Sequence, residues 1–193
     1  MVTTDVRARR REATRREILD AAWRLAAEQG LANLSLRDVA AEVGMRAPSL
    51  YTYFDSKGSM LDAMFAQGYR ELDELYAGVR SDGDLAAMLT AATEAFVRFC
   101  QASVPRYQLM FTRAVAGWEP SARAYEVSVA SYEHMRDRLA AAGVQGQRAL
   151  DLWTAMTAGL AAQQLANDPD GDRWFVLSRD VAVMFVDHLR RNR

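Results

Sequence analysis

The sequence predicts an all-α fold of about nine helices, and three observations support this class. Apolar residues recur at spacings of three and four along most of the chain, as they do on one face of a helix. The 11 glycines and 4 prolines in 193 residues lie mainly between these periodic segments. No two neighbouring segments alternate apolar and polar residues in the way that paired strands do.

The first expected helix spans residues 9–29. Ile18, Leu19 and Ala22 lie at helical spacing within it, and Gly30 follows in the position of a C-terminal cap. The helix is preceded by a basic arm, because residues 1–16 contain six arginines against two acidic side chains. Such an arm suits contact with phosphates at one end of the molecule, although a solvated tail would have the same composition.

Two short helices follow the first one. Ser35 is expected to cap the second helix, and Asp38 completes a pair that resembles a capping box. Gly44 then supplies a left-handed turn, and Pro48 lies where the third helix begins, because its missing N–H group is not needed there. A short capped helix, a glycine-centred turn and a second short helix form the layout of a helix-turn-helix, which places its second helix in the major groove of DNA.

The rest of the chain reads as long helices separated by polar or glycine-containing breaks. A fourth helix begins at Asp55 or Ser56 and continues to about Val79, and a break at 81–84 follows. We therefore expect an N-terminal arm and helix-turn-helix domain over residues 1–55 and a ligand-binding and dimerisation domain over residues 56–193. Further helices are expected over residues 84–103, 105–115, 121–142, 147–166 and 173–191.

Composition excludes several classes of protein. No run approaches the roughly 18 apolar residues of a membrane span, and no apolar run follows the N-terminal arginines as in a secretory signal. A single cysteine, Cys100, cannot form an internal disulfide, which fits a reducing cytoplasm. We therefore expect a cytoplasmic protein without a membrane partner.

In the helix-turn-helix layout, the residues expected to face DNA differ in which part of the DNA their side chains can contact. Arg37 and Arg46 can each donate two hydrogen bonds to guanine, and Ala47 and Pro48 can contact a thymine methyl group. The hydroxyls of Ser49 and Thr52 suit bases or phosphates. Phosphate contacts are expected from the remaining members, which are Ser35 through its backbone N–H, Tyr51, Tyr53 and Lys57, the only lysine of the chain.

These same residues carry a resemblance to a known family. The segments Arg15–Ala22, Leu34–Ala40 and Ser49–Lys57, with Gly30 and Gly44 between them, resemble the TetR family of one-component transcriptional regulators over residues 10–61. The C-terminal half is similar to one common subtype, through Pro105–Phe111, Trp153 and Gly159.

The resemblance implies a homodimer that occupies a palindromic operator as a repressor and leaves it when a small molecule binds. It also implies phosphate contacts at Tyr51, Tyr53 and Lys57. Two positions depart from the family pattern. Ala47 replaces the Ser or Thr that often caps the third helix, and Ala158 replaces a histidine that often precedes the glycine, so a ligand role for that histidine does not transfer.

A dimer requires an interface, and the last two helices are the best candidates. A stripe of small residues on one and apolar side chains on the other would form a four-helix bundle with a second copy. The alternative is that these residues pack on helices of their own chain. The residues assigned to the interface are Ala155, Ala158, Gly159, Ala162, Ala166, Val176, Val183 and Val186.

An effector of largely apolar character would need a pocket among the middle helices. Ligand pockets are mostly apolar with a few polar groups, although aromatic residues at helical spacing are more often simply core residues. Met135, Glu94, His134, Gln163 and Gln164 are secondary candidates. The residues assigned to the pocket are Phe96, Phe99, Cys100, Tyr107, Met110, Phe111, Trp118, Tyr125, Trp153 and Met156.

Catalysis finds no support in the sequence. It contains no Cys-x-x-Cys or paired-histidine metal spacing, no glycine-rich phosphate loop and no Gly-x-Ser-x-Gly elbow. We expect no catalytic residue, metal or cofactor. The alternatives to a repressor are an activator with the same DNA-reading helix, or a helical small-molecule-binding protein that retains it.

Overall fold

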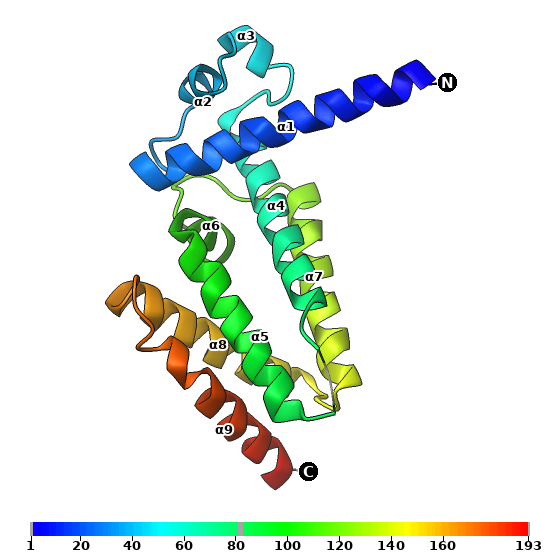
Figure 1. Cartoon of the computed structure of the whole chain (residues 1–193), viewed down its shortest axis with the longest axis vertical. Helices are drawn as coiled ribbons and strands as arrows, with labels where there is room; N and C mark the ends of the chain where they lie inside the picture. The colour runs from blue at the N-terminus through cyan, green and yellow to red at the C-terminus, as the bar shows by residue number, and fades with distance from the viewer. Residues whose placement is uncertain (1, 81–82, 193) are drawn as a thin grey trace. The chain divides into compact units, whose positions relative to one another are not determined.

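The computed structural model describes residues 2–80 and 83–192, with side chains from Val6 onward. Within these ranges the chain forms nine α-helices and one 3-10 turn and contains no strand (Figure 1), so the all-α prediction is confirmed. Ser81 and Asp82, part of the break expected at 81–84, lie outside the described residues. The elements are α1 (Val2–Gln29), α2 (Leu36–Glu42), α3 (Ala47–Leu50), α4 (Lys57–Ala77), α5 (Leu85–Ala102), α6 (Val104–Phe111), α7 (Ala122–Ala141), α8 (Gln147–Asn167), η1 (Phe175–Leu177) and α9 (Ser178–Arg191).

The helices group into two compact units. The first comprises Met1–Gly68 and Pro105–Tyr125, and the second comprises Tyr69–Val104 and Glu126–Arg193. Helix α4 contributes residues 57–68 to the first unit and residues 69–77 to the second. The division into functional domains at 1–55 and 56–193 stays a prediction, because compactness groups residues by contact and not by what they do.

The first unit has its core where α1, α2, α3 and the start of α4 meet. Helix α2 packs against both α1 and α3 (Figure 1). Ile18 and Leu50 are fully buried, and Leu34 and Phe54 are almost so. Burial of an aliphatic or aromatic side chain of this size contributes about 1.5–3 kcal/mol, so the short α2 and α3 depend on this core for their stability.

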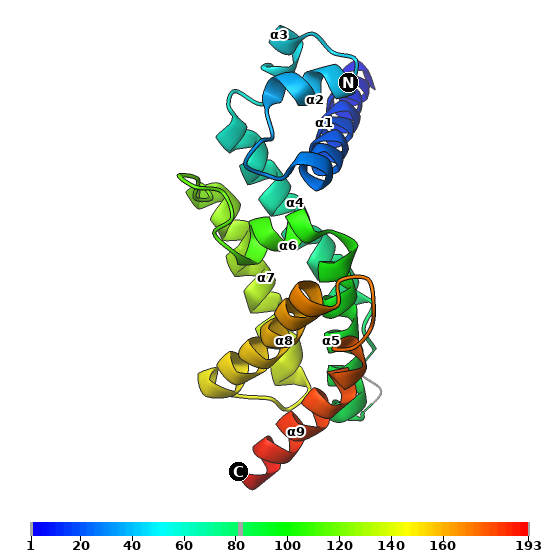
Figure 2. The same cartoon turned by 90° about the vertical axis from the view of Figure 1, so that its left-hand side faces the viewer.

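The second unit is organised around α5, which packs against α8 and α9 (Figure 2). Leu89, Leu139, Trp153 and Phe185 belong to one buried cluster. The rings of Trp153 and Phe185 lie with their centroids 5.2 Å apart in a tilted arrangement, which joins α8 to α9.

The structure corrects one expected bound in the first unit and defines the end of the short α3. Helix α1 begins at Val2 and not at residue 9, so the arginine-rich arm is helical. Arginine and alanine are strong helix formers, and no glycine or proline interrupts residues 2–29. Helix α3 ends at Leu50 and continues as a turn, because Tyr53 N donates to Leu50 O at 2.8 Å in the tighter i to i+3 pattern.

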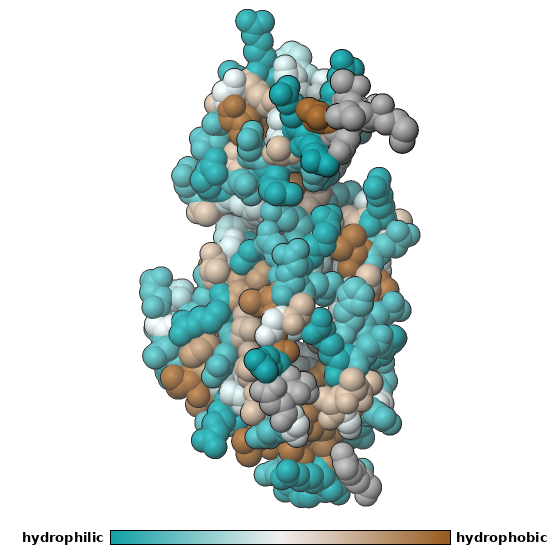
Figure 3. All heavy atoms as spheres, turned by 45° about the vertical axis from the view of Figure 1, so that its right-hand side comes forward, coloured by the Kyte–Doolittle hydropathy of each residue, from teal (hydrophilic) through white to brown (hydrophobic). Residues whose placement is uncertain are grey.

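In the described residues, no helix combines the length and the apolar character that crossing a membrane requires. The face drawn in Figure 3 is mostly hydrophilic, and apolar side chains interrupt it in several places.

Candidate functional site

Helix α2 begins with the cap that the sequence predicts. The Ser35 hydroxyl oxygen accepts a hydrogen bond from Asp38 N at 3.2 Å, and the same hydroxyl donates to Asp38 Oδ2 at 2.6 Å. The cap satisfies one of the N–H groups left open at a helix start. Leu36, Val39 and Ala40 are buried, which leaves Arg37 on the exposed side of the helix.

The turn into α3 depends on Gly44. Its φ is +66°, in the left-handed region that residues with a Cβ adopt only at a cost. Helix α3 then begins at Ala47 with Pro48 in its first turn, and Arg46 precedes it without a side-chain hydrogen bond to the helix. Proline replaces a capping side chain here by removing one of the open N–H donors.

The outward side of α3 and its following turn presents most of the residues predicted to face DNA. Arg46, Pro48, Ser49, Tyr51 and Thr52 are exposed, with 54 % of Tyr51 accessible. Leu50 and Phe54 lie between them in sequence and are buried in the core. The buried pair therefore orients the exposed residues, and Ala47 and Tyr53 lie half-buried at the edge of the same surface.

Two arginines of α1 contact the turn that follows α3. Arg11 Nη2 donates to Thr52 O at 2.7 Å, and its guanidinium lies 4.9 Å from the centre of the Tyr53 ring. The Arg15 guanidinium lies at the same distance from the Phe54 ring. These contacts link α1 to the turn that carries Tyr51, Thr52 and Tyr53. Part of the basic arm therefore packs against the rest of the first unit and is not simply solvated.

Lys57 makes a contact within the chain. Its Nζ donates to Ala32 O at 2.7 Å, which ties the start of α4 to the loop before α2. Partial burial lowers the pKa of the Lys57 ammonium from its ordinary value. An ammonium group has three donors, so two remain for a phosphate at this half-buried position.

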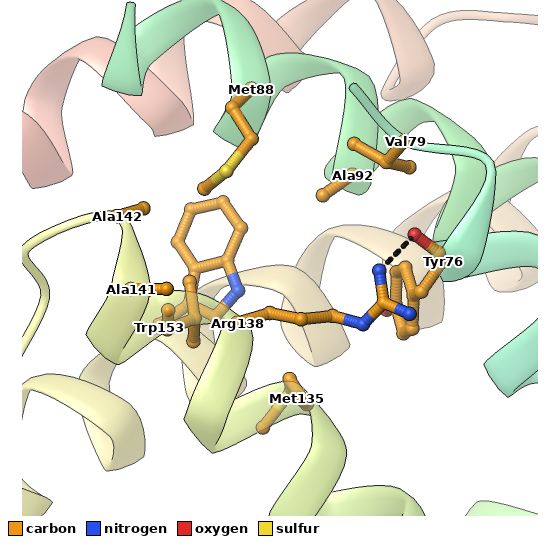
Figure 4. A pocket seen from close by; sticks show the side chains of 10 residues that line it. Tyr76, Val79, Met88, Ala92, Met135, Arg138, Ala141, Ala142 and Trp153 are labelled. Atoms are coloured by element: carbon orange, nitrogen blue, oxygen red, sulfur yellow. Dashed lines mark hydrogen bonds between the residues drawn. The ribbon is translucent and has the colours of Figure 1, made fainter. Parts of the chain in front are cut away.

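The second unit contains an apolar cavity of about 210 Å³ (Figure 4). Its walls come from the end of α4, from α5, α7 and α8. Figure 4 shows the Met88 side chain pointing toward the Trp153 ring and Arg138 extending to the carbonyl oxygen of Tyr76. The lining residues are Tyr76, Val79, Met88, Ala92, Met135, Arg138, Leu139, Ala141, Ala142 and Trp153.

Of the ten residues predicted to form a pocket, this cavity contains Trp153, and it also contains the secondary candidate Met135. Phe96, Phe99 and Cys100 are buried on α5, and Met156 packs against the core of the second unit. The structure does not bring the ten together at this cavity, so the remaining assignments stay predictions. Tyr107, Met110, Phe111, Trp118 and Tyr125 belong to the first unit, and Tyr125 is 57 % exposed.

The predicted interface residues lie mostly on the outside of α8 and α9. Ala155, Ala158, Gly159 and Ala166 are exposed, and Ala162 is half-buried. Large apolar side chains are exposed nearby in the chain, among them the predicted Val176 at 58 % and Val183 at 39 %. Leu177 and Met184 are exposed with them, at 37 % and 62 %.

Val186 differs from the other assigned interface residues because it is buried within the single chain. Only 5 % of it is exposed, and it belongs to the cluster around Trp153 and Phe185. Val183 and Val186 are three residues apart and so only about 60° apart around α9, and the packing of α9 within its own unit covers Val186 while Val183 stays 39 % exposed. Val186 therefore stabilises its own unit, and its assignment to an interface stays a prediction.

The connection between α8 and α9 is held by Gln164, a fully buried side chain. Its Oε1 accepts hydrogen bonds from Trp174 N at 2.9 Å and Phe175 N at 2.8 Å, and its Nε2 donates to Gly171 O at 3.1 Å and to Asp168 O. The amide thereby uses both donors and accepts twice, which fixes the loop that leads to Val176.

Comparison with known proteins agrees with this geometry. The model of the family described as "Bacterial regulatory proteins, tetR family" matches residues 18–64, which include α2 and α3. The HTH-type transcriptional repressor KstR2 of Rhodococcus jostii is 39 % identical over 89 residues, or 42 % of each chain. The chain therefore aligns with about two fifths of the length of this curated relative.

Solved structures resemble the chain over most of its length. SCO4313, described as a regulatory protein, superposes with a TM-score of 0.76 and 23 % identity, covering 93 % of this chain and 98 % of that one. TetR-Q116A from Acinetobacter baumannii, in complex with minocycline, superposes with a TM-score of 0.62 and 21 % identity, covering 91 % of this chain and 96 % of that one. At these identities the likeness shows the fold.

Residues 18–64 of this chain match the tetR family. The resemblance seen in the sequence is thus confirmed over this segment, and the family and KstR2 are both described as regulatory proteins. Among the described residues, no three His, Cys, Asp or Glu side chains gather as a metal site would require.

The sequence does not show the contacts that join distant elements of this chain. Arg11 was counted only as part of a basic arm, and no sequence signal connects it with Thr52, 41 residues away. Tyr76 and Arg138 were not considered for the pocket at all. Their positions at the ends of two apolar-periodic helices, α4 and α7, were the one available signal.

Proposed function

We propose that the chain is a homodimeric transcriptional regulator that represses by binding a palindromic operator and is released by a small, largely apolar effector. The observation that carries the proposal is the exposure of Arg46, Pro48, Ser49 and Tyr51 on α3 and at its two ends, while Leu50 of the same helix is buried. A DNA partner implies action in the cytoplasm.

Each exposed residue has a role that follows from its chemistry. Arg37 and Arg46 read guanine through paired N–H donors, and Pro48 with Ala47 contacts a thymine methyl group. The remaining candidates position the protein on the sugar-phosphate backbone of DNA by donating to phosphate oxygens, and the hydroxyls of two of them, Ser49 and Thr52, can also bond to base edges. These candidates are Ser35, Ser49, Tyr51, Thr52, Tyr53 and Lys57.

The homodimer is supported by exposed apolar residues of η1 and α9 and by the small residues of α8. Val176 and Leu177 of η1 and Val183 and Met184 of α9 are costly to leave in water, and the small residues of α8 permit close approach of a second helix. Two-fold symmetry would place the two α3 helices about 34–36 Å apart, so that both enter the same side of the duplex.

Effector binding would act by shifting populations. A ligand that binds one spacing of the two α3 helices better than another favours that spacing, by no more than the difference in its affinities. The apolar cavity of the second unit supports this step. Helix α4 is the candidate connection, because one continuous helix supplies residues to both units.

Electrophoretic shifts on operator and random duplexes test the DNA assignment. Tyr51→Ala should weaken binding to every duplex, whereas Arg46→Ala should relax preference at particular base pairs, by about 1–3 kcal/mol. Arg113→Ala is the matched control, since this exposed arginine lies outside residues 18–64. Unchanged affinity and preference in both test variants would refute the proposal.

Repression is tested separately from binding. A promoter that carries the selected operator should be more active in cells lacking the chain than in cells containing it. The opposite result would indicate an activator that uses the same α3 surface. Failure to retain any duplex at low salt, where phosphate contacts are strongest, would favour a small-molecule-binding protein instead.

A further inference from the structure

We propose that the cavity of the second unit binds a small apolar molecule that ends in one carboxylate, and that Arg138 binds this carboxylate. The inference rests on the proposed function and specifies the chemical class of its effector. Two features of the cavity lead to it: walls that are almost entirely apolar, and a single charged side chain among them.

The walls suit a hydrocarbon chain or ring. Val79, Met88, Ala92 and Met135 offer no hydrogen-bonding group, and the Trp153 ring closes one side (Figure 4). Methionine adapts its shape to a ligand through three rotatable bonds. The volume of about 210 Å³ lies below the roughly 300–1,000 Å³ of common ligand pockets, so a small molecule fits best.

Arg138 is held where it can meet an anion. Its Nη1 donates to Tyr76 O at 2.8 Å, and this hydrogen bond keeps the long side chain extended along the cavity instead of directed away from it (Figure 4). A guanidinium has five N–H donors, so one hydrogen bond leaves donors for a second partner. Because the side chain is already ordered, less conformational entropy is lost when a ligand binds.

The charge of Arg138 is also uncompensated within the described part of the chain. No carboxylate there forms an ion pair with it. Arg136, two residues earlier on the same helix, differs in this respect, since its Nη2 lies 2.9 Å from Asp137 Oδ1. Both arginines are exposed to solvent, but the chain pairs Arg136 with a carboxylate and leaves Arg138, which lines the cavity, for an external anion.

A single carboxylate matches this arrangement better than a more highly charged group. The planar guanidinium pairs with the two oxygens of a carboxylate in parallel hydrogen bonds. A second negative charge on the ligand would face the apolar walls without a partner, which costs free energy. Burial also raises the pKa of the Tyr76 phenol, which keeps this wall residue neutral.

Three eight-carbon probes test the inference on the full-length chain: octanoate, octan-1-ol and octylamine. Binding is followed by calorimetry and by the fluorescence of Trp153 in a variant in which the other three tryptophans are Phe. We expect octanoate to bind most tightly and octylamine least. Arg138→Gln should weaken octanoate at least about tenfold, which is 1.4 kcal/mol, and leave octan-1-ol unchanged.

Two controls separate charge recognition from loss of structure. Arg136→Gln removes a positive charge from the same helix without touching the cavity and should bind octanoate as the unchanged chain does. Arg138→Lys should recover part of the affinity, because the charge returns without the paired donors. Retained binding of octan-1-ol by Arg138→Gln shows that the cavity is intact.

The inference is overturned if Arg138→Gln binds octanoate as tightly as the unchanged chain, if octan-1-ol binds more tightly than octanoate, or if no probe binds. These outcomes are independent of DNA. Tyr51→Ala should lose DNA affinity and keep octanoate affinity, so failure of the regulator proposal and failure of the ligand class are distinguishable.

Discussion

The α2–α3 segment and the cavity of the second unit are constructed from interactions of different range. In the segment, Ser35 bonds to Asp38 three residues away, and Gly44 turns the chain by its own backbone conformation. In the cavity, Tyr76 and Arg138 meet across 62 residues of sequence, and the walls come from four helices. The DNA-facing surface is therefore determined locally, whereas the cavity depends on how whole helices pack.

This difference teaches where substitutions should act. A change in the local segment should alter DNA binding while ligand binding persists, because it disturbs one turn of backbone. A change at a long-range contact should disturb several helices together. Arg11 is an exception in the first unit, since it joins α1 to Thr52 over 41 residues.

The largest expected effect is at Gln164, where the long-range arrangement of the second unit is concentrated. Gln164→Leu leaves the N–H groups of Trp174 and Phe175 and the Gly171 carbonyl without their partner. We expect a loss of about 3 kcal/mol in the free energy of unfolding. Urea unfolding measures it, with Gln163→Leu as control because that neighbouring side chain is exposed.

The same variant tests whether the α8–α9 connection serves the dimer. Gln164→Leu should shift sedimentation toward the monomer at concentrations where Gln163→Leu remains dimeric. An equal loss of stability in the two variants would mean that the buried hydrogen bonds contribute nothing beyond a surface glutamine.

Gly44→Ala should have the next largest effect. At φ +66° an alanine costs about 1–2 kcal/mol, and no atom lies within 4 Å of the added Cβ, so the whole cost is backbone strain. Gly58→Ala is the control of opposite sign. Gly58 is helical and its new Cβ would meet only ordinary contacts, so stability should rise by about 0.4–1 kcal/mol.

Arg11→Ala examines the exception. Removing the contacts to Thr52 O and the Tyr53 ring should loosen the turn after α3 and weaken operator binding about fivefold, or roughly 1 kcal/mol. Arg10→Ala removes the same charge from an exposed position on α1. If the two variants lose equal affinity in a shift assay, Arg11 contributes to operator binding only through its positive charge and not through its contacts with the turn.

The smallest expected effect concerns pH and the start of α4. Hydrogen bonds from Ser59 and then Ser56 lower the pKa of the Asp55 carboxyl. Because the folded pKa lies below the ordinary value, this stabilisation is present above that value and is lost as the pH falls through the folded pKa. Urea midpoints measured into the acid range should fall less steeply for Asp55→Asn than for the unchanged chain.

Asp20→Asn serves as the control, since Asp20 is exposed on α1. An equal change of slope in the two variants would contradict a specific role for the hydrogen bonds of Ser59 and Ser56.

Much of the fold could be predicted because helices depend on residues three or four apart. The Ser35 cap, the Gly44 turn and the Pro48 start were all visible in the sequence and appear in the structure. The segments expected after residue 84 correspond to α5, α6, α7, α8 and the pair η1 and α9, with ends displaced by a few residues. End positions shift because fraying and local turns compete there.

The candidate site was predictable only in part, for the same physical reason. By itself, the sequence determined that Arg46, Ser49 and Tyr51 lie on or beside the same short helix as the apolar Leu50, because that relation lies within two turns. Tertiary structure decided that Arg138 reaches Tyr76, that Lys57 bonds to Ala32, and that Val186 is covered while Val183 is exposed. Periodicity shows which residues share a face, but only the packing of distant helices determines what that face meets.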